Sequence, residues 1–180
     1  MATLDTASSV PAAVQELLEK EAIRELLSRC FRGSDRENAE LAESCHPPDG
    51  NINLGIYDGP ARDFFKGTAA FRAPMLAVIH HIGQSRIELG SDGDVAAGET
   101  YVIATYVLPG EGEPQTTVLM ARYLDRFEKR DGEWKIADRL VAFDAQLNVE
   151  GGVPTMAPEQ NWGHRDESDP SYALFASLQS

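Results

Sequence analysis

The stretch from Met120 to Arg139 constrains the fold of this chain more than any other. It reads Met-Ala-Arg-Tyr-Leu-Asp-Arg-Phe-Glu-Lys-Arg, then Asp131-Gly132, then Glu-Trp-Lys-Ile-Ala-Asp-Arg. Apolar and polar residues alternate on both sides of Asp131-Gly132, and an Asp-Gly pair supplies the positive φ angles of a tight hairpin turn. We therefore predict two antiparallel strands, over residues 116–129 and 133–146, joined at this turn.

A first helix is expected ahead of Gly33, because glycine commonly ends helices. Four apolar residues follow the spacing i, i+3, i+4 and i+7 that marks one face of a helix: Ile23, Leu26, Leu27 and Cys30. The helix should begin after Ser8 or Ser9, either of which can cap it, with Pro11 in its first turn. This pattern places Cys30 on the inward face.

Two shorter helices are expected further along the chain. One runs over residues 36–45, with Ser34 or Asp35 at its N-cap. The other runs over residues 68–79, although Pro74 falls within it and would delay its start or kink it.

Strand patterns dominate from His80 onward. Besides the hairpin, β-branched and aromatic residues favour strands over residues 85–89 and 95–108, separated by turn-forming Asp and Gly residues. Residues 51–65 match no periodic pattern. Helices followed by strands, without alternation, favour an α+β fold with helices on one face of a curved sheet, rather than a doubly wound parallel sheet.

The composition fits one globular domain. The chain has 180 residues, of which 42% are hydrophobic and 25% charged, enough to bury a sizeable core. We expect this domain over residues 1–150. The tail over residues 151–180 is rich in Pro, Gly, Asn and Asp and then offers a few apolar side chains, with which it could pack on the domain or on a neighbouring subunit.

The charge and the apolar pattern exclude several classes of partner. A formal net charge of −13 repels phosphate backbones, so nucleic-acid binding is not expected. The first residues lack the basic and apolar segments of a leader, and no run approaches the roughly 20 apolar residues of a membrane span. We therefore expect a cytoplasmic protein without membrane contact, in which Cys30 and Cys45 are reduced thiols.

Three segments occur in an order found in a known family: Arg32-Gly-Ser-Asp-Arg36, His80-His-Ile-Gly-Gln84 and Arg122-Tyr-Leu-Asp-Arg-Phe127. The chain closely resembles, in these segments, the SnoaL-like proteins of the nuclear-transport-factor-2-like superfamily. The resemblance implies a single domain in which a cone-like, curved antiparallel or mixed sheet packs against N-terminal helices and encloses an apolar pocket. It also implies a small-molecule substrate and self-association as a dimer or trimer.

The resemblance further implies the residues of the site. Similar enzymes include dehydratases, dehydrochlorinases and polyketide cyclases, and their acid–base pair falls on Asp35 and His80 of this chain. Several relatives also carry an arginine five residues after the hairpin tryptophan, a position occupied here by Arg139. Residues expected to line the substrate pocket are Cys30, Phe31, Tyr57, Tyr101, Tyr123, Val141 and Phe143.

The chemistry of these side chains fits a general base. A histidine titrates near pH 6.5, so His80 can accept a proton at neutral pH, and a carboxylate on its other ring nitrogen fixes the tautomer and stabilises the imidazolium. Asp35 could supply that carboxylate. Arg139 stays charged and could hold a carboxylate, a phenolate or an oxyanion that develops during the reaction.

Strand alternation predicts which side chains reach the pocket. It should place Arg139 on the face of Val141 and Phe143, opposite Trp134, Ile136 and Leu140. It should also turn the neighbouring His80 and His81 to opposite faces, so that only one reaches the pocket, and we expect this one to be His80.

One position departs from the resemblance. Relatives commonly carry a tyrosine or a lysine five residues before the aspartate, and this chain has Cys30. A neutral thiol is a poor proton donor, and buried cysteines are mostly packing residues. The general acid must then come from another residue, and the candidates are Tyr57, Tyr101, Tyr106 and Tyr123.

Each candidate also has an ordinary structural role open to it. Asp35 could cap the helix that follows it, His80 could be a packed and hydrogen-bonded histidine, and Arg139 could pair with a surface carboxylate. Their joint occurrence at the positions that the resemblance implies favours a working acid–base site.

The sequence predicts no cofactor. It contains no His-Glu-x-x-His pair or other metal-ligand spacing, and it has neither a Gly-x-Gly-x-x-Gly fingerprint nor a phosphate-binding loop. Metal and nucleotide dependence are therefore not expected.

These features together predict a cofactor-independent lyase that acts by acid–base catalysis on a small hydroxylated substrate, with an aromatic one favoured. Water loss and retro-aldol-type C–C cleavage, which releases a small aldehyde such as formaldehyde, both need such a base and a group that accepts developing charge. The alternative is a non-catalytic protein, which either binds small molecules or is an assembly protein like the small subunit of an oxygenase. A ketosteroid-like isomerase would need a second carboxylate or a tyrosine dyad in the pocket.

Overall fold

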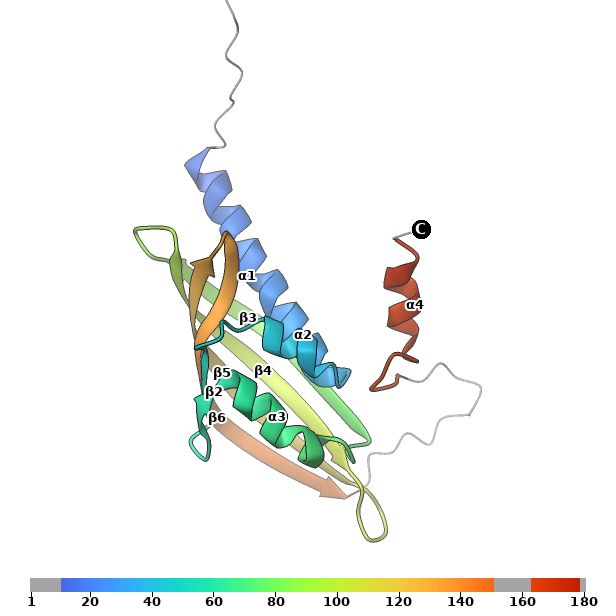
Figure 1. The fold of residues 1–180 in the computed structure, drawn as a ribbon. Helices are drawn as coiled ribbons and strands as arrows, with labels where there is room; N and C mark the ends of the chain where they lie inside the picture. The colour runs from blue at the N-terminus through green and yellow to red at the C-terminus, as the bar shows by residue number, and fades with distance from the viewer. Residues whose placement is uncertain (1–10, 151–162, 179–180) are drawn as a thin grey trace, which may run out of the picture.

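The structure is a computed structural model, and it describes residues 11–150 and 163–178 (Figure 1). The helices of these residues are α1 (Ala12–Asp35), α2 (Ala39–Ser44), α3 (Ala61–Arg72) and α4 (Pro170–Ala176). The strands are β1 (Asn51–Asn53), β2 (Asp58–Pro60), β3 (Ala77–Leu89), β4 (Val95–Leu108), β5 (Gln115–Arg130) and β6 (Glu133–Glu150).

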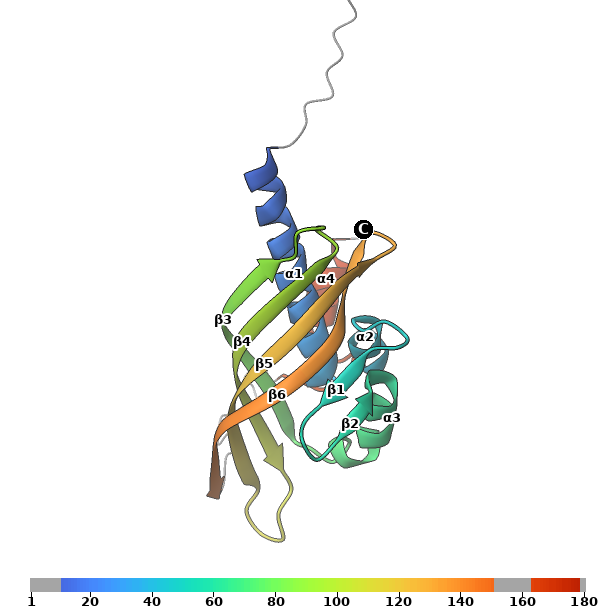
Figure 2. The same ribbon diagram turned by 90° about the vertical axis from the view of Figure 1, so that its left-hand side faces the viewer.

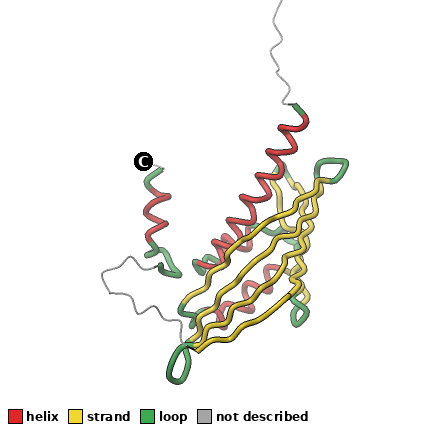
Figure 3. The backbone as a smooth tube through the Cα atoms, turned by 180° about the vertical axis from the view of Figure 1, so that it is seen from behind, coloured by secondary structure: helices red, strands yellow, loops and turns green. Residues whose placement is uncertain are grey.

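The strands of the described residues form one curved, unclosed sheet in the order β2-β1-β6-β5-β4-β3. Strands β3 to β6 form an antiparallel meander, whereas β1 runs parallel to β6. In Figure 2 the meander lies in front of α1, and α3 lies beside it next to β1 and β2; Figure 3 shows the face of the sheet that the helices leave uncovered. The predicted α+β fold, with N-terminal helices on a curved mixed sheet, is confirmed.

The hairpin between β5 and β6 turns where the sequence predicts it. Asp131 and Gly132 have φ angles of 53° and 82°, the left-handed conformation that an Asp-Gly turn supplies. Lys129 pairs with Trp134 across this turn. Both strands extend beyond the predicted ranges, because the ladder continues to Gln115 and Glu150.

Helix α1 runs through Gly33 to Asp35, so the expectation that Gly33 ends the helix is wrong. Gly33 is buried where α1 meets α2, and a Cβ atom at this position would lie 2.5 Å from the backbone nitrogen of Ala42. Glycine is therefore needed for the close approach of the two helices. Ser8 and Ser9, the expected caps, lie outside the described residues.

The next two helices differ from their predicted bounds. Helix α2 is capped by Asn38, whose side chain accepts a hydrogen bond from the Leu41 N–H at 2.9 Å, so neither Ser34 nor Asp35 caps it. Helix α3 follows Pro60 and ends at Arg72, and residues 77–79 belong to β3. Pro residues stand before and after α3 because a proline is tolerated at a helix start and interrupts a helix interior.

The main core lies between α1 and the sheet. Its fully buried side chains include Ile23, Leu26, Leu27, Phe127 and Ile136. Burying each such side chain stabilises the fold by about 1.5–3 kcal/mol. A smaller cluster of Ala42, Ile52, Ala61 and Phe65 packs α2 and α3 against β1.

A β-bulge in β6 changes the predicted side-chain faces. Arg126 pairs with Asp138 and Phe127 pairs with Ile136, so Ala137 is an extra residue in β6. Because one extra residue reverses the alternation, Ile136 and Arg139 both face the helices. The prediction that Arg139 lies opposite Trp134 and Ile136 is therefore wrong.

The last described segment contacts α1 through Arg32. The Arg32 guanidinium lies 4.9 Å from the centre of the Tyr172 ring and 5.2 Å from that of Phe175, and it donates a hydrogen bond to Ser171 Oγ at 3.0 Å. The division into a domain over residues 1–150 and a packing tail stays a prediction. Among the described residues, no helix has the length and apolar character needed to cross a membrane.

Candidate active site

A cavity of about 100 Å³ lies between α1, α3 and the helix-facing side of the sheet. Phe31, Phe64, Phe65, Val78 and Val141 give it mostly apolar walls. Its polar or charged lining residues are Ser34, Arg72, His80, Tyr106, Tyr123 and Arg139. A concave apolar site with a few placed polar groups is typical of small-molecule binding.

Asp35 and His80 form a hydrogen-bonded pair beside this cavity. His80 Nδ1 lies 2.6 Å from Asp35 Oδ1, and the backbone N–H of His80 donates to Asp35 Oδ2 at 3.1 Å. Only 13% of the Asp35 side chain and 7% of the His80 side chain are exposed. Because a carboxylate only accepts hydrogen bonds, Nδ1–H of a neutral His80 donates to Asp35, and Nε2 is then the ring nitrogen that can accept a proton.

Tyr106 extends this arrangement on the other side of the imidazole. Its hydroxyl lies 3.3 Å from His80 Nε2, and the two rings meet edge to face with centres 5.9 Å apart. Burial and the nearby Asp35 carboxylate raise the pKa of Tyr106 to about 12. The tyrosine is therefore protonated at neutral pH and can donate its proton.

Arg139 lines the cavity but is paired with a carboxylate. Nε and Nη2 donate to the two oxygens of Asp125 at 2.8 Å each, and the Asp125 side chain is completely buried. Burial opposes the charge of Arg139, but the Asp125 carboxylate outweighs this effect and raises the pKa of Arg139. The pair is locally neutral, and the Arg139 guanidinium lies over the ring of Tyr123 at 4.5 Å.

Cys30 lines the cavity and lies beside a histidine. His46 Nδ1 donates to the Ile136 carbonyl at 3.0 Å, which turns Nε2 toward Cys30 Sγ at 3.9 Å. A hydrogen bond from Cys45, with His46 and Arg139 nearby, outweighs burial and lowers the pKa of the Cys30 thiol. Among the described residues, no group of three or more His, Cys, Asp or Glu side chains could hold a metal ion.

The other expected pocket residues are divided among three places. Phe31, Tyr123 and Val141 line the cavity with Cys30. Tyr57 and Phe143 line a wider apolar pocket of about 520 Å³ that shares Leu54, Phe64, Arg72 and Tyr106 with the cavity.

Tyr101 does not reach either pocket. It lies beside His81 on the face of the sheet away from the helices, and 42% of it is exposed. Residues 101 and 106 of β4 point to opposite faces because their separation is odd. The expectation that Tyr101 lines the substrate pocket is therefore corrected.

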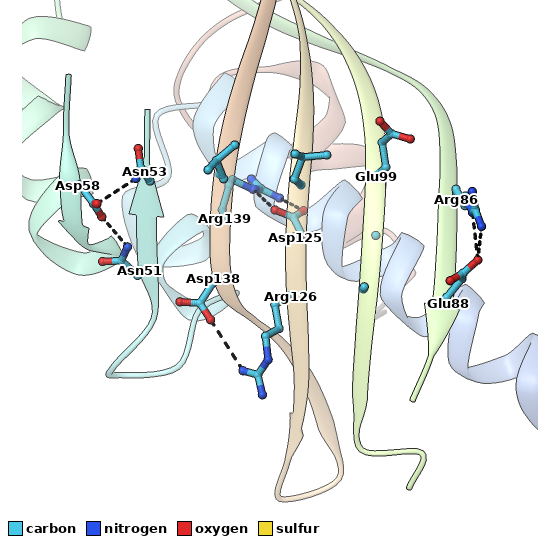
Figure 4. A pocket seen from close by; sticks show the side chains of 14 residues that line it. Asn51, Asn53, Asp58, Arg86, Glu88, Glu99, Asp125, Arg126, Asp138 and Arg139 are labelled. Carbon is cyan, nitrogen blue, oxygen red and sulfur yellow. Dashed lines mark hydrogen bonds and ion pairs between the residues drawn. The ribbon is translucent and has the colours of Figure 1, made fainter. Parts of the chain in front are cut away.

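An open hollow of about 680 Å³ covers part of this outer face (Figure 4). Its side chains are largely paired with one another, as Arg86 is with Glu88 and Arg126 with Asp138. Neither Asp35 nor His80 lines it. The candidate base His80 therefore lies at the inner cavity and not at this hollow.

Two charged residues of this region were missed in the sequence. Asp125 looks like an ordinary strand residue until its pairing with Arg139 is known. Arg72 lies seven residues after Phe65 on α3, a spacing that places both on one helix face. The signal was present, but α3 was expected at residues 68–79, where this spacing is lost.

Comparisons with known proteins agree with this fold. A sequence model of the SnoaL-like domain matches residues 15–140. A hexachlorocyclohexane dehydrochlorinase, LinA type 2, superposes with a TM-score of 0.70 at 22% identity, covering 83% of this chain and 100% of that chain. LinA type 3 from Novosphingobium barchaimii LL02 gives 0.65 at 23% identity, covering 82% of this chain and all of the other.

A third solved structure has the same fold. The neighbour comes from Novosphingobium aromaticivorans DSM 12444 and has a provisional assignment as scytalone dehydratase. It superposes with a TM-score of 0.68 at 20% identity, covering 82% of this chain and 99% of that chain. No curated protein matches the sequence. The domain match covers more than two thirds of the 180 residues, and the chain belongs to the SnoaL-like domain family.

Proposed function

We propose that this protein is a cofactor-independent lyase in which His80 is the general base. The observation that carries the proposal is the hydrogen-bonded series of Asp35, His80 and Tyr106 at the wall of a mostly apolar cavity. An elimination requires a base with a fixed tautomer, a proton donor beside this base, and little competing water.

In this mechanism His80 removes a proton from the substrate with Nε2. Asp35 holds the proton on Nδ1 and, from 2.6 Å away, stabilises the imidazolium that forms. Phe31 packs against the imidazole with ring centres 5.1 Å apart and so limits its rotation. Asp35 thus acts through His80, and His80 is the residue that touches the substrate.

Tyr106 is the proposed proton donor among the four tyrosines that the sequence left open. Its pKa of about 12 is below the ~15.7 of water, so proton transfer to a departing hydroxide is favourable. Tyr106 can deliver this proton within the cavity because its hydroxyl is already at hydrogen-bond distance from the base.

Arg139 has a more limited part in the proposal than the sequence suggested. Its charge is balanced by Asp125, so it adds little net attraction for an anionic substrate. Its guanidinium packs on Tyr123 and Phe31, and we assign it the placement of these two rings at the cavity wall.

The names of the structural relatives support the reaction class. A dehydrochlorinase and a dehydratase both carry out eliminations, in which a base removes a proton while a neighbouring group leaves. For this chain we propose either loss of water or retro-aldol-type C–C cleavage. In the second case the base removes a hydroxyl proton, the C–C bond breaks, and a small aldehyde such as formaldehyde is released. The electron pair of that bond passes to an acceptor group of the remaining substrate fragment, which takes up a proton by way of His80 or Tyr106.

The test is single-turnover mass analysis against hydroxylated aryl-propanoid, steroid and polyketide-like compounds, with His80→Ala and Asp35→Asn run alongside. Loss of water or of a small aldehyde in the wild type, abolished in both variants, supports the lyase and identifies its branch. Turnover that survives both substitutions contradicts the proposed base.

A non-catalytic binding or assembly protein is the second candidate, favoured by Cys30 in place of the family's tyrosine or lysine. Equal binding of a panel compound to all three proteins, without turnover, would favour it.

Self-association as a dimer or trimer is also proposed, together with a cytoplasmic location. The outer face of the sheet exposes apolar side chains of several strands: Ile79, Tyr101, Ile103, Met120, Leu140 and Leu147. Faces of this kind commonly bind another protein surface.

A further inference from the structure

Two buried arginine nitrogens have no hydrogen-bond partner in the described part of the chain, and both lie in one cluster. They are Nε of Arg72 and Nε of Arg165. Buried polar atoms are nearly always hydrogen-bonded, and an exception calls for an explanation such as a bound ligand or ion. The cluster formed by Arg72, Arg165 and Glu37 therefore has unused capacity for an acceptor.

Arg72 stands where the two pockets meet. It is the last residue of α3, only 9% of it is exposed, and it lines both the inner cavity and the wider pocket. Its Nη2 donates to the Phe65 carbonyl at 3.1 Å, which holds the guanidinium in place. His80 and Tyr106 line the same cavity as Arg72.

One carboxylate, that of Glu37, serves both arginines of this cluster. Its Oε2 is bonded to Arg165, and its Oε1 lies 4.0 Å from Arg72 Nη2. Glu37 has a φ angle of 52°, an unfavourable backbone conformation for this residue type that its contacts must stabilise. Asp35 is the other carboxylate that acts on Arg165, and burial lowers the pKa of Arg165.

Arg139, the other arginine that lines the cavity, already uses its nitrogens for contacts within the protein. Arg139 donates two nitrogens to Asp125, and its Nη1 points to Cys30 Sγ at 3.8 Å. Of the two arginines that line the cavity, Arg72 is the one whose charge is only partly compensated.

We propose that Arg72 binds a carboxylate of the substrate, which makes the substrate an elongated, largely apolar acid. The inference rests on the proposed function for its link to turnover, because the bound acid would extend from Arg72 into the cavity toward His80. A planar guanidinium matches a carboxylate geometrically, and the apolar walls strengthen the interaction. Arg72, and not Arg139, would then select the substrate.

The test compares binding of 3-phenylpropanoate and of its neutral amide by calorimetry. The wild type should prefer the acid by roughly tenfold or more, the effect of hydrogen bonds to a charged group. Arg72→Gln should remove this preference. The matched control is Arg62→Gln on the same helix, whose side chain is 55% exposed, and it should keep the preference. An equal preference for the acid in Arg72→Gln and the wild type overturns the proposal.

A second measurement uses the wild type and so does not depend on the folding of Arg72→Gln. The Arg72 Nε–H resonance, assigned by its absence from the spectrum of Arg72→Lys, should shift when 3-phenylpropanoate is added and stay in place with the amide. A shift with phosphate or chloride alone would assign the cluster to an inorganic ion and overturn the proposal.

The inference and the proposed function can fail separately. His80→Asn should keep the preference for the acid while losing turnover. A preference that depends on Arg72, without turnover of any panel compound in the wild type, would support the inference and contradict the lyase. If the wild type turned over neutral compounds only, and Arg72→Gln did so at the same rate, the lyase would be supported and the inference contradicted.

Discussion

The carboxylate of Asp35 contacts His80 at two points, the ring Nδ1 at 2.6 Å and the backbone N–H at 3.1 Å. The first contact fixes the tautomer of the imidazole, and the second ties the C-terminal end of α1 to the beginning of β3. Helix and strand therefore position each other at the place where the proton transfer is proposed.

Asp35→Asn should lower the rate of turnover by about 10²–10⁴-fold, because an amide can donate to Nδ1 and so stabilise the wrong tautomer. Substrate binding should change little, since Asp35 acts through His80. The measurement is the single-turnover rate on the compound that reacts in the panel. Asp63→Asn is the control, because the Asp63 side chain is 59% exposed on α3 and should leave the rate unchanged. Equal rates for the two variants would contradict the role of Asp35.

Tyr106→Phe should reduce turnover by roughly 10²-fold, the usual contribution of a general acid. It should also change the alkaline stability. Burial raises the pKa of Tyr106 to about 12 from 10.0, so the unfolded chain loses this proton first as the pH rises above 10. The free energy of unfolding of the wild type should then fall by up to about 1.4 kcal/mol per pH unit from this residue.

Urea unfolding on either side of pH 10.0 measures this effect. The fall of the free energy of unfolding with rising pH should be less steep in Tyr106→Phe than in the wild type. Burial also raises the pKa of Tyr123, so part of the alkaline loss should remain in the variant. An identical slope in wild type and variant would show that Tyr106 is solvated rather than enclosed.

Asp125→Ala should destabilise the protein by about 3–5 kcal/mol, because it leaves the buried charge of Arg139 without a partner. Asp138→Ala removes a carboxylate 3.8 Å from Arg126, where both side chains are about half exposed, and should cost about 1 kcal/mol or less. Denaturant unfolding compares the two. Similar losses would mean that the Arg139 pair is accessible to water.

Gly33→Ala should destabilise the protein by about 1–3 kcal/mol and slow turnover, because its Cβ would press on Ala42 and displace Asp35 two residues later. Gly67→Ala is the matched control in α3, since a Cβ there meets nothing within 4 Å and should stabilise the helix by about 0.5–1 kcal/mol. Thermal melts of both variants measure these effects, and the melting temperature should fall in Gly33→Ala and rise in Gly67→Ala. A Gly33→Ala variant as stable as the wild type would contradict the close approach of α1 and α2.

The hairpin could be predicted because its signals are local. Asp131-Gly132 and the alternation beside it describe the turn and both strands without reference to the rest of the chain. The pairing of Asp35 with His80 was expected only from their order within a family resemblance. It could not follow from periodicity, because 45 residues separate them.

The bulge at Ala137 could not be predicted. A bulge adds one residue without a distinctive residue type, and the register shift is visible only when β5 and β6 are aligned. The face of Arg139 and its pairing with Asp125 both depend on this shift. Arg72 was missed for a related reason, since the bounds of α3 depend on its packing against Ile52 and Ala42.

The most direct test of the central claim is the protonation of the His80 ring at neutral pH, read from ¹⁵N chemical shifts in the wild type and in Asp35→Asn. The account predicts a proton on Nδ1 and a free electron pair on Nε2 in the wild type, a preference that Asp35→Asn should weaken. A proton on Nε2 in the resting wild-type protein would contradict the account, because His80 could not then accept a proton from the substrate.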